Sequence, residues 1–144
     1  MNVEGILKAK GHEVQTVGPD TAVVLAVDRL SAMQIGALVV SADGSKVDGV
    51  ISEREVVRGL AHHGPRLLDL KVADVMARHV PVCSPEDPIK DVMAQMTRTR
   101  NRHVPVVQGA QLYGLVSIGD LLKHRLEELE LQTNVLRDPY ITRH

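Results

Sequence analysis

The sequence predicts an α/β fold built from two similar β-α-β-β-α units. The chain has 144 residues, the size of one ordinary domain, and 44% of them are hydrophobic, which is ample for a core. Short apolar runs that suit buried strands alternate with stretches of helical periodicity. This alternating pattern occurs twice, so we expect two copies of one supersecondary unit.

The duplication is clearest where each unit ends. The segment GVISERE at 49–55 matches GLVSIGD at 114–120, which begins 65 residues later. The differences in spacing between the copies are small and fall in loops, as expected for an internal repeat. Two further matches lie upstream: ALVV at 37–40 with HVPV at 103–106, and VEGIL at 3–7 with VADVM at 72–76.

In the first copy, the elements follow from apolar spacing and from turn residues. Apolar residues at helical intervals predict helices, Asp43-Gly44 predicts the turn of a β-hairpin, and Gly64-Pro65 ends the closing helix. The expected elements are a lead-in helix (1–10), an opening strand (13–17), a helix (22–34), two strands (35–40 and 47–52) and a closing helix (53–62).

The second copy follows a linker at 64–70 and repeats the same order. Pro88 is expected in the first turn of its central helix, and the arginine-bearing segment 98–102 is expected to be a polar loop. The expected elements are a lead-in helix (71–78), an opening strand (81–84), a helix (88–97), two strands (103–107 and 112–116) and a long helix from about 118 to about 136, before Pro139.

These units set the expected domain boundaries. Residues 1–66 form the first repeat, 67–124 the second, and 125–144 a helical extension and tail. A single unit leaves one face of its sheet uncovered, so the two sheets are expected to pack together about a pseudo-two-fold axis. The repeats should therefore depend on each other for stability.

Each closing helix begins with residues suited to binding an anion, because a helix N-terminus carries unpaired N–H groups and a partial positive charge. Ser117 offers a hydroxyl, and Gly119 lets a ligand approach the backbone. Asp120 can accept hydrogen bonds from two neighbouring hydroxyls, as on a ribose. Taken alone, Ser117 and Asp120 fit a helix cap better, but the occurrence of the whole unit twice favours a binding site.

With two strand–helix–strand–strand–helix copies that each close on G-h-h-S-x-x-D/E, the chain resembles a tandem pair of cystathionine-β-synthase (CBS) domains, often called a Bateman module. The resemblance covers nearly the whole chain, and the two motifs are specific because they occur as a correctly spaced pair. It implies a regulatory module and does not imply catalysis. It also implies that adenine nucleotides or related adenosyl ligands bind in clefts between the repeats.

The symmetry predicts two clefts, one at each closing helix. In the second cleft, phosphate and ribose would lie at the helix start, and arginine suits phosphate through paired hydrogen bonds. Arg98 and Arg100 are expected to be solvated turn residues. The candidate ligand-binding residues of the second cleft are Ser117, Ile118, Gly119, Asp120, Arg102 and His103.

The first cleft should differ from the second. Glu55 stands where the family usually has Asp, and Arg54 either reaches a phosphate or pairs with Glu55 in solvent. Thr21 fits a helix N-cap as well as a ligand contact, and the small residues Gly36 and Ala37 replace the Arg-His pair of the second cleft. The candidates of the first cleft are Thr16, Thr21, Gly36, Ala37, Ser52, Arg54 and Glu55.

Adenine would need a flat apolar slot, and the chain contains no Trp or Phe. Aliphatic side chains would therefore clamp the base, with backbone hydrogen bonds adding specificity. The candidates, which also fit ordinary core positions at a cleft wall, are Val17, Ile35, Val82, Val104 and Pro105.

Other functions find little support in the sequence. Cys83 lies on an expected strand without a neighbouring histidine, the pair His62-His63 lacks metal-ligand spacing, and no phosphate-binding glycine loop is present, so we expect no enzyme. A net charge of −1 and only two tyrosines argue against nucleic-acid binding. No apolar run nears the ~20 residues that span a bilayer and no secretory signal is evident, so we expect no membrane partner and a cytoplasmic location.

The sequence therefore predicts a regulatory, signal-transducing CBS pair that binds AMP, ADP, ATP or NAD(H) and changes conformation or assembly in response. Two alternatives stay open: a scaffolding module with empty clefts, and a regulatory subunit whose separate protein target supplies all chemistry. A homodimer is expected through the CBS faces and the final helix, where an apolar stripe extends beyond the second repeat. This stripe consists of Leu122, Leu126, Leu129 and Leu136.

Overall fold

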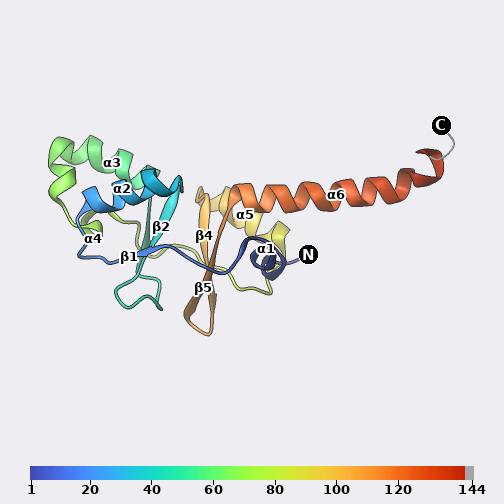
Figure 1. The fold of residues 1–144 in the computed structure, drawn as a ribbon, viewed down its shortest axis with the longest axis horizontal. Helices are drawn as coiled ribbons and strands as arrows, with labels where there is room; N and C mark the ends of the chain where they lie inside the picture. Colours follow the sequence, from blue (N-terminus) through green and yellow to red (C-terminus); the bar gives the residue numbers. More distant parts are fainter. Residues whose placement is uncertain (142–144) are drawn as a thin grey trace.

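The computed structural model describes the backbone of residues 1–141 and the side chains of residues 1–132. In order, its elements are α1 (Val3–Lys10), β1 (Thr16–Val17), α2 (Val23–Met33), β2 (Ala37–Val40), β3 (Gly49–Ser52), α3 (Glu53–His63), a 3₁₀ helix η1 (Gly64–Asp69), α4 (Val72–Val75), α5 (Ile89–Thr99), β4 (His103–Gln108), β5 (Gln111–Ser117) and α6 (Ile118–Ile141). The strands occupy the middle of the molecule, helices flank them on either side, and α6 projects away from the body (Figure 1). The predicted α/β class is therefore confirmed.

The two sheets are small and unequal. The first has the order β1-β2-β3, with β1 parallel to β2 and β2 antiparallel to β3. The second consists of β4 paired antiparallel with β5. The opening strand expected at 81–84 is wrong, because only Cys83 makes a parallel bridge, to Val106. Prolines two residues to either side of Cys83 lack the N–H groups that a longer ladder needs.

Equivalent backbone contacts recur in the two halves, as the pseudo-two-fold arrangement requires. In both repeats the opening segment meets the middle strand in a parallel bridge, and the lead-in segment of one repeat meets the central helix of the other in an antiparallel bridge. The parallel contacts are Val17 with Val40 and Cys83 with Val106; the antiparallel contacts are Ala22 with Lys71 and Pro88 with Asn2.

The lead-in helices are exchanged between the halves. α1 packs into the core that contains α5, α6, β4 and β5, whereas α4 packs into the core that contains α2 and the first sheet. The side chains buried in this way are Val3, Ile6 and Leu7 of α1 and Val72 of α4. Each half lacks part of its core without the other, so the repeats depend on each other for folding.

Two equivalent glycines receive the exchanged segments. A Cβ on Gly49 would lie 2.5 Å from the carbonyl oxygen of Ala77, just after α4. A Cβ on Gly114 would lie 2.7 Å from the end of the Leu7 side chain on α1. Both positions therefore require glycine because another segment approaches closely, and neither requires an unusual backbone angle.

The expected boundaries of two helices, α4 and α2, are wrong. The helix expected at 71–78 forms only α4, because Ala77 leaves it to exchange two backbone hydrogen bonds with Val50, at 2.9 and 3.1 Å. The N-cap of α2 is Ala22 and not Thr21. The Thr21 carbonyl oxygen instead accepts a hydrogen bond of 2.8 Å from the Val72 N–H.

The boundaries of α5 also differ from those expected. Pro88 is its N-cap and does not lie in its first turn. The helix continues to Thr99, so Arg98 is helical and the polar loop shrinks to residues 100–102. Arg100 ends the helix in the left-handed region, with φ of 57°, and its N–H donates to the Met96 carbonyl oxygen.

The final helix, α6, runs beyond the expected end at 136 and through Pro139, since a proline removes one helical hydrogen bond without always ending the helix. Of the predicted apolar stripe, Leu122, Leu126 and Leu129 are between 42% and 57% exposed. Leu136 lies outside the described side chains. Among the described residues, no helix combines the length and the apolar character needed to cross a membrane.

Candidate functional site

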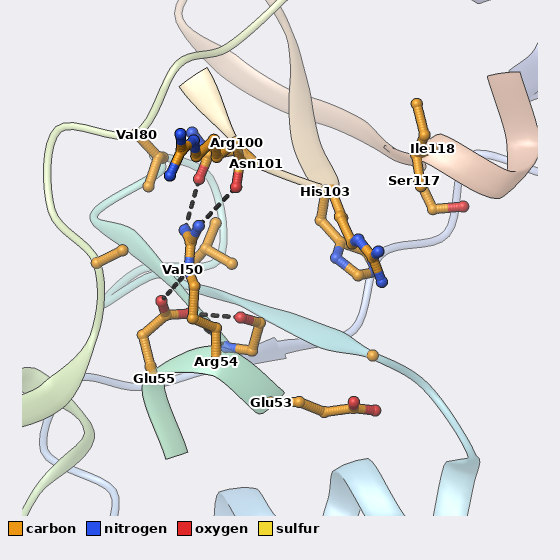
Figure 2. A pocket seen from close by; sticks show the side chains of 14 residues that line it. Val50, Glu53, Arg54, Glu55, Val80, Arg100, Asn101, His103, Ser117 and Ile118 are labelled. Carbon is orange, nitrogen blue, oxygen red and sulfur yellow. Dashed lines mark hydrogen bonds and ion pairs between the residues drawn. The ribbon is translucent and has the colours of Figure 1, made fainter. Parts of the chain in front are cut away.

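A cavity of about 520 Å³ lies where the two repeats meet. The ends of β3 and β5, the first turns of α3 and α6, and the loop between α5 and β4 border it (Figure 2). The two helix starts that the sequence assigned to separate clefts thus open onto one shared space. The lining residues are Gly36, Val50, Ser52, Glu53, Arg54, Glu55, Ala77, Val80, Arg100, Asn101, Arg102, His103, Ser117 and Ile118.

Backbone hydrogen bonds hold both helix starts at this cavity. The Ile118 N–H of α6 donates to the Arg102 carbonyl oxygen at 2.8 Å. The Glu53 N–H of α3 donates to the Gly36 carbonyl oxygen at 3.3 Å. The positive ends of two helices therefore meet at one place, which suits a bound anion.

The start of α3 is closed by its own hydrogen bonds. The Ser52 N–H and hydroxyl both donate to Glu55 Oε1, at 2.9 and 2.6 Å, in a capping box. Arg54 Nε donates to Glu55 Oε2 at 3.2 Å. Both carboxylate oxygens of Glu55 are engaged, and the residue is only 4% exposed. The expected pairing of Arg54 with Glu55 therefore occurs, but at a buried carboxylate and not in solvent.

The start of α6 repeats these contacts with a different cation. The Ser117 N–H donates to Asp120 Oδ2 at 2.9 Å, and the Asp120 N–H donates to Ser117 Oγ at 3.1 Å. Lys10, from the exchanged helix α1, donates to the same Oδ2 at 2.8 Å and to the Leu115 carbonyl oxygen at 2.9 Å. Burial raises the pKa of Asp120, but the hydrogen bonds from Lys10 and Ser117 outweigh it and hold this pKa below its ordinary value.

Basic side chains from the second repeat line the cavity: Arg100, Arg102 and His103. Burial lowers the pKa of His103, and the nearby charges of Lys10 and Arg102 contribute, so the imidazole is neutral at neutral pH. A Cβ on Gly36 would lie 2.9 Å from His103 Cε1, so the first repeat makes room for this ring.

Some predicted site residues come together at the cavity and others do not. Those that line it are Gly36, Ser52, Arg54, Glu55, Arg102, His103, Ser117 and Ile118. Those outside its lining are Thr16, Val17, Thr21, Ile35, Ala37, Val82, Val104, Pro105, Gly119 and Asp120.

None of the five aliphatic side chains expected to clamp adenine lines this cavity. Val17 and Val104 are buried in the two cores, and Val82 borders a separate hollow of about 300 Å³. The apolar part of the cavity wall comes from Ile118 and from three residues that the sequence did not indicate: Val50, Ala77 and Val80.

Three polar lining residues were also missed. Glu53 follows Ser52 directly, and the loop that carries Arg100 and Asn101 was recognised only as polar and solvated. This loop accepts hydrogen bonds from Arg54 of the other repeat, and a contact between residues so far apart in the sequence cannot be predicted from local residue spacing. A lone arginine next to a helix start, as at Arg54, was the one available signal.

Among residues 1–132, the possible metal ligands are dispersed and the one cysteine is buried. The His, Cys, Asp and Glu side chains of these residues form no group of three or more that could hold a metal ion. Burial, reinforced by the Asp87 charge, raises the pKa of Cys83 to about 12. This thiol therefore stays protonated at neutral pH and is a poor nucleophile.

Comparison with known proteins identifies both repeats. The CBS domain family matches residues 10–62 and again residues 72–127. The CBS domain-containing protein CBSX3, mitochondrial, of Arabidopsis thaliana is 30% identical over 134 residues, which are 88% of this chain and 65% of that protein. The chain therefore spans less than two thirds of that relative's length.

Solved structures share the whole fold. A CBS-domain containing protein from Agrobacterium tumefaciens is 40% identical with a TM-score of 0.83, and the match covers 87% of this chain and 99% of that one. The CBS domain pair of protein MJ0100, solved in complex with 5′-methylthioadenosine and S-adenosyl-L-methionine, is 21% identical with a TM-score of 0.76, over 85% and 98% of the two chains, and this likeness concerns the fold. With both repeats matched and the fold shared over most of its length, the chain belongs to the CBS-domain family as a tandem pair.

Proposed function

We propose that this CBS pair is a regulatory module that binds an adenosyl nucleotide in the cavity between its repeats. AMP, ADP, ATP and NAD are the candidate ligands. The observation that carries the proposal is the convergence of two helix N-termini and the basic residues Arg100 and Arg102 on one cavity. Ligand binding would change conformation or assembly, a partner protein would read that change, and the chain itself would perform no chemical step.

The charges around the cavity favour a ligand that carries phosphate. Arg100 and Arg102 are exposed on its wall, so their guanidinium groups are accessible to a ligand entering from solvent. The partial positive charges at the starts of α3 and α6 act in the same direction. A volume of about 520 Å³ falls in the usual range of small-molecule sites.

The ligand class is also supported by a structural neighbour. Both molecules bound by the MJ0100 pair contain adenosine. One of them carries a sulfonium cation and neither carries phosphate, whereas the arginines of the present cavity would repel a cation and attract phosphate. We therefore favour phosphate-bearing adenosyl ligands for this chain.

Calorimetric titration with AMP, ADP, ATP and NAD, together with mass spectrometry of any ligand released from the purified protein, tests the proposal. Arg102→Ala should weaken binding of the favoured nucleotide about tenfold, as for one lost charge-assisted hydrogen bond. Arg98→Ala, which removes an exposed arginine of α5 outside the cavity, is the matched control and should leave affinity unchanged. No binding of any of the four, with no released ligand, would contradict the proposal.

We also propose that the chain forms a homodimer. Leu122, Leu126 and Leu129 of α6 are exposed, and so are Leu25 of α2 and Val57 of α3. Burying these side chains against a second copy would remove apolar surface from water. Light scattering of the full chain and of a form truncated after Lys123 tests this. A monomeric full chain at micromolar concentration would contradict the dimer, and a dimeric truncated form would assign the contact to the CBS faces.

A further inference from the structure

Arg54 joins the two repeats through the three nitrogen atoms of its side chain. Nη1 donates to the Arg100 carbonyl oxygen at 2.6 Å, and Nη2 donates to Asn101 Oδ1 at 2.7 Å. Nε donates to Glu55 Oε2 at 3.2 Å. Figure 2 shows the guanidinium reaching from the start of α3 to the loop before β4, so this one side chain spans the cavity between its two walls.

The acceptors of Arg54 are also held by contacts that do not involve Arg54. Arg100 is fixed by its left-handed backbone at the end of α5, and Asn101 Nδ2 donates to the Thr99 carbonyl oxygen at 3.2 Å. Glu55 is fixed by its two hydrogen bonds from Ser52. A planar guanidinium with its donors in a rigid fork matches such a preformed set, which a lysine ammonium would not.

Among residues 1–132, this arginine connection has no copy at the start of α6, where Lys10 of α1 reaches Asp120 instead. The residue equivalent to Arg54 in the second repeat is Gly119, which has no side chain to reach across. Because each side-chain nitrogen of Arg54 already has an acceptor, Arg54 differs from Arg102, for which the described residues provide no hydrogen-bond partner to its side chain.

We propose that Arg54 is a positioning residue whose hydrogen bonds to Arg100 and Asn101 link the two repeats and set the width of the cavity; we call this link the clasp. Phosphate recognition would then depend on the other basic residues of the cavity wall. The part of this proposal that concerns phosphate rests on the proposed function. The clasp itself is a property of the ligand-free chain and is tested without a ligand.

A double-mutant cycle in the full chain tests the clasp through the midpoint of thermal unfolding. Arg54→Ala should lower the Tm by about 5 °C and Asn101→Ala by about 3 °C, and the double variant should lose clearly less than the sum. Arg58→Ala is the matched control, an exposed arginine of α3 outside this cavity, and should add to Asn101→Ala. Additive losses for Arg54 and Asn101 would overturn the clasp. If Arg54→Ala does not fold, Arg54→Lys, which keeps the charge without the fork, takes its place in the cycle.

Titration with AMP and adenosine separates a positioning role from a phosphate contact. A wider cavity should weaken both ligands alike, so Arg54→Ala should keep the ratio of their affinities within about twofold, whereas Arg102→Ala should lower it about tenfold. If Arg54→Ala lowers this ratio as Arg102→Ala does, Arg54 is a phosphate ligand and the proposal is overturned. If the wild-type chain binds neither ligand, the proposed function fails for AMP, and the thermal cycle alone decides on the clasp.

Discussion

The two closing helices start with the same serine and acidic residue but stabilise this pair in different ways. At α3, the cation is Arg54 from the same turn, and both oxygens of the buried Glu55 are engaged. At α6, the cation is Lys10 from the exchanged helix α1, and among the described residues only Oδ2 of the partly exposed Asp120 accepts hydrogen bonds. Both starts therefore join the repeats, the first through Arg54 and the loop at 100–101 and the second through Lys10, but among the described residues only the second has a carboxylate oxygen that accepts no hydrogen bond.

This difference shows how two copies of one unit can share a backbone and divide the side-chain roles. Arg54 of the first repeat corresponds to Gly119 of the second, and Arg102 of the second corresponds to Gly36 of the first. Each repeat thus supplies a basic residue at a position where the other has glycine. The pseudo-two-fold symmetry of the backbone therefore produces one asymmetric cavity.

The largest difference between the repeats is expected at their equivalent glycines. Gly49→Ala should lower the free energy of unfolding by about 2–3 kcal/mol, because the Ala77 carbonyl oxygen belongs to the backbone and cannot move aside easily. Gly114→Ala should cost less, about 1 kcal/mol, because its close neighbours are the methyl groups of the Leu7 side chain, which can shift further than a backbone atom. Urea denaturation measures both, with Gly5→Ala, a position in ordinary contact, as the control; equal losses at 49 and 114 would contradict the difference.

Asp120 does not line the cavity, but it is hydrogen-bonded to Ser117, which does, and its Oδ1 accepts no hydrogen bond from the described residues, so we expect ligand affinity to depend on it. Asp120→Ala should weaken binding of AMP or NAD by about 1–3 kcal/mol, as for a lost hydrogen bond to a charged group. Calorimetry measures the change, and Glu127→Ala, which removes an exposed carboxylate further along α6, is the control. Unchanged affinity in Asp120→Ala would remove this residue from the binding site.

The stability of the ligand-free chain should depend more on the carboxylate of Glu55 than on that of Asp120. Glu55→Ala should lower the free energy of unfolding by about 1–2 kcal/mol, since it leaves donors of Ser52 and Arg54 without their buried acceptor. Asp120→Ala should cost less than about 1 kcal/mol, because its pair with Lys10 is partly exposed and screened by solvent. Urea denaturation compares the two variants, and a greater loss for Asp120→Ala would reverse the assignment of roles.

The smallest expected effect is the pH dependence that His103 contributes, because the first repeat has no imidazole at the equivalent position. His103 has Ala37 as its counterpart in the first repeat. Because the pKa of His103 is lowered in the folded chain, the unfolded chain binds more protons between the folded value and the ordinary value of 6.5. The contribution of His103 to the free energy of unfolding is therefore fully present above the ordinary pKa, and it is lost as the pH falls through the folded pKa.

Urea denaturation between about pH 5 and pH 7.5 measures this dependence. His103→Gln should flatten the decline of stability toward acid pH, whereas His63→Gln, at the exposed end of α3, should leave it as it is. An identical slope in the wild-type chain and in His103→Gln would show that burial of this imidazole does not govern the decline.

Features that depend on nearby residues were predictable. The helix α3 begins at Glu53 as expected, because Ser52 and Glu55 form a capping box within four residues. The hairpin strands follow from apolar runs on either side of turn residues, and the second copy of each pattern reinforces the first. Eight of the predicted site residues line the cavity because they lie at or beside these strand and helix ends.

The wrong predictions mostly concern contacts between residues far apart in the sequence. The expected helix at 71–78 is cut short because Ala77 bonds to the distant strand β3. The expected strand at 81–84 is reduced to a single bridge at Cys83, because the prolines on either side cannot extend the ladder. The adenine clamp was expected from apolar residues that in fact fill the two cores, as Val17 and Val104 do. An apolar residue at a strand position has the same local pattern whether it faces the core or a cavity, so sequence alone could not separate the two.

The sequence by itself determined the α/β class, the two repeats and the acidic helix starts, because each of these rests on short-range spacing that occurs twice. Only the tertiary structure decided that α1 completes the second repeat, that Lys10 pairs with Asp120, and that Arg54 bridges to the loop at 100–101. The two polar contacts join residues 110 and 46 positions apart. Such contacts depend on how the exchanged helices dock against the opposite sheets, and that packing leaves no periodic pattern in either copy of the repeat.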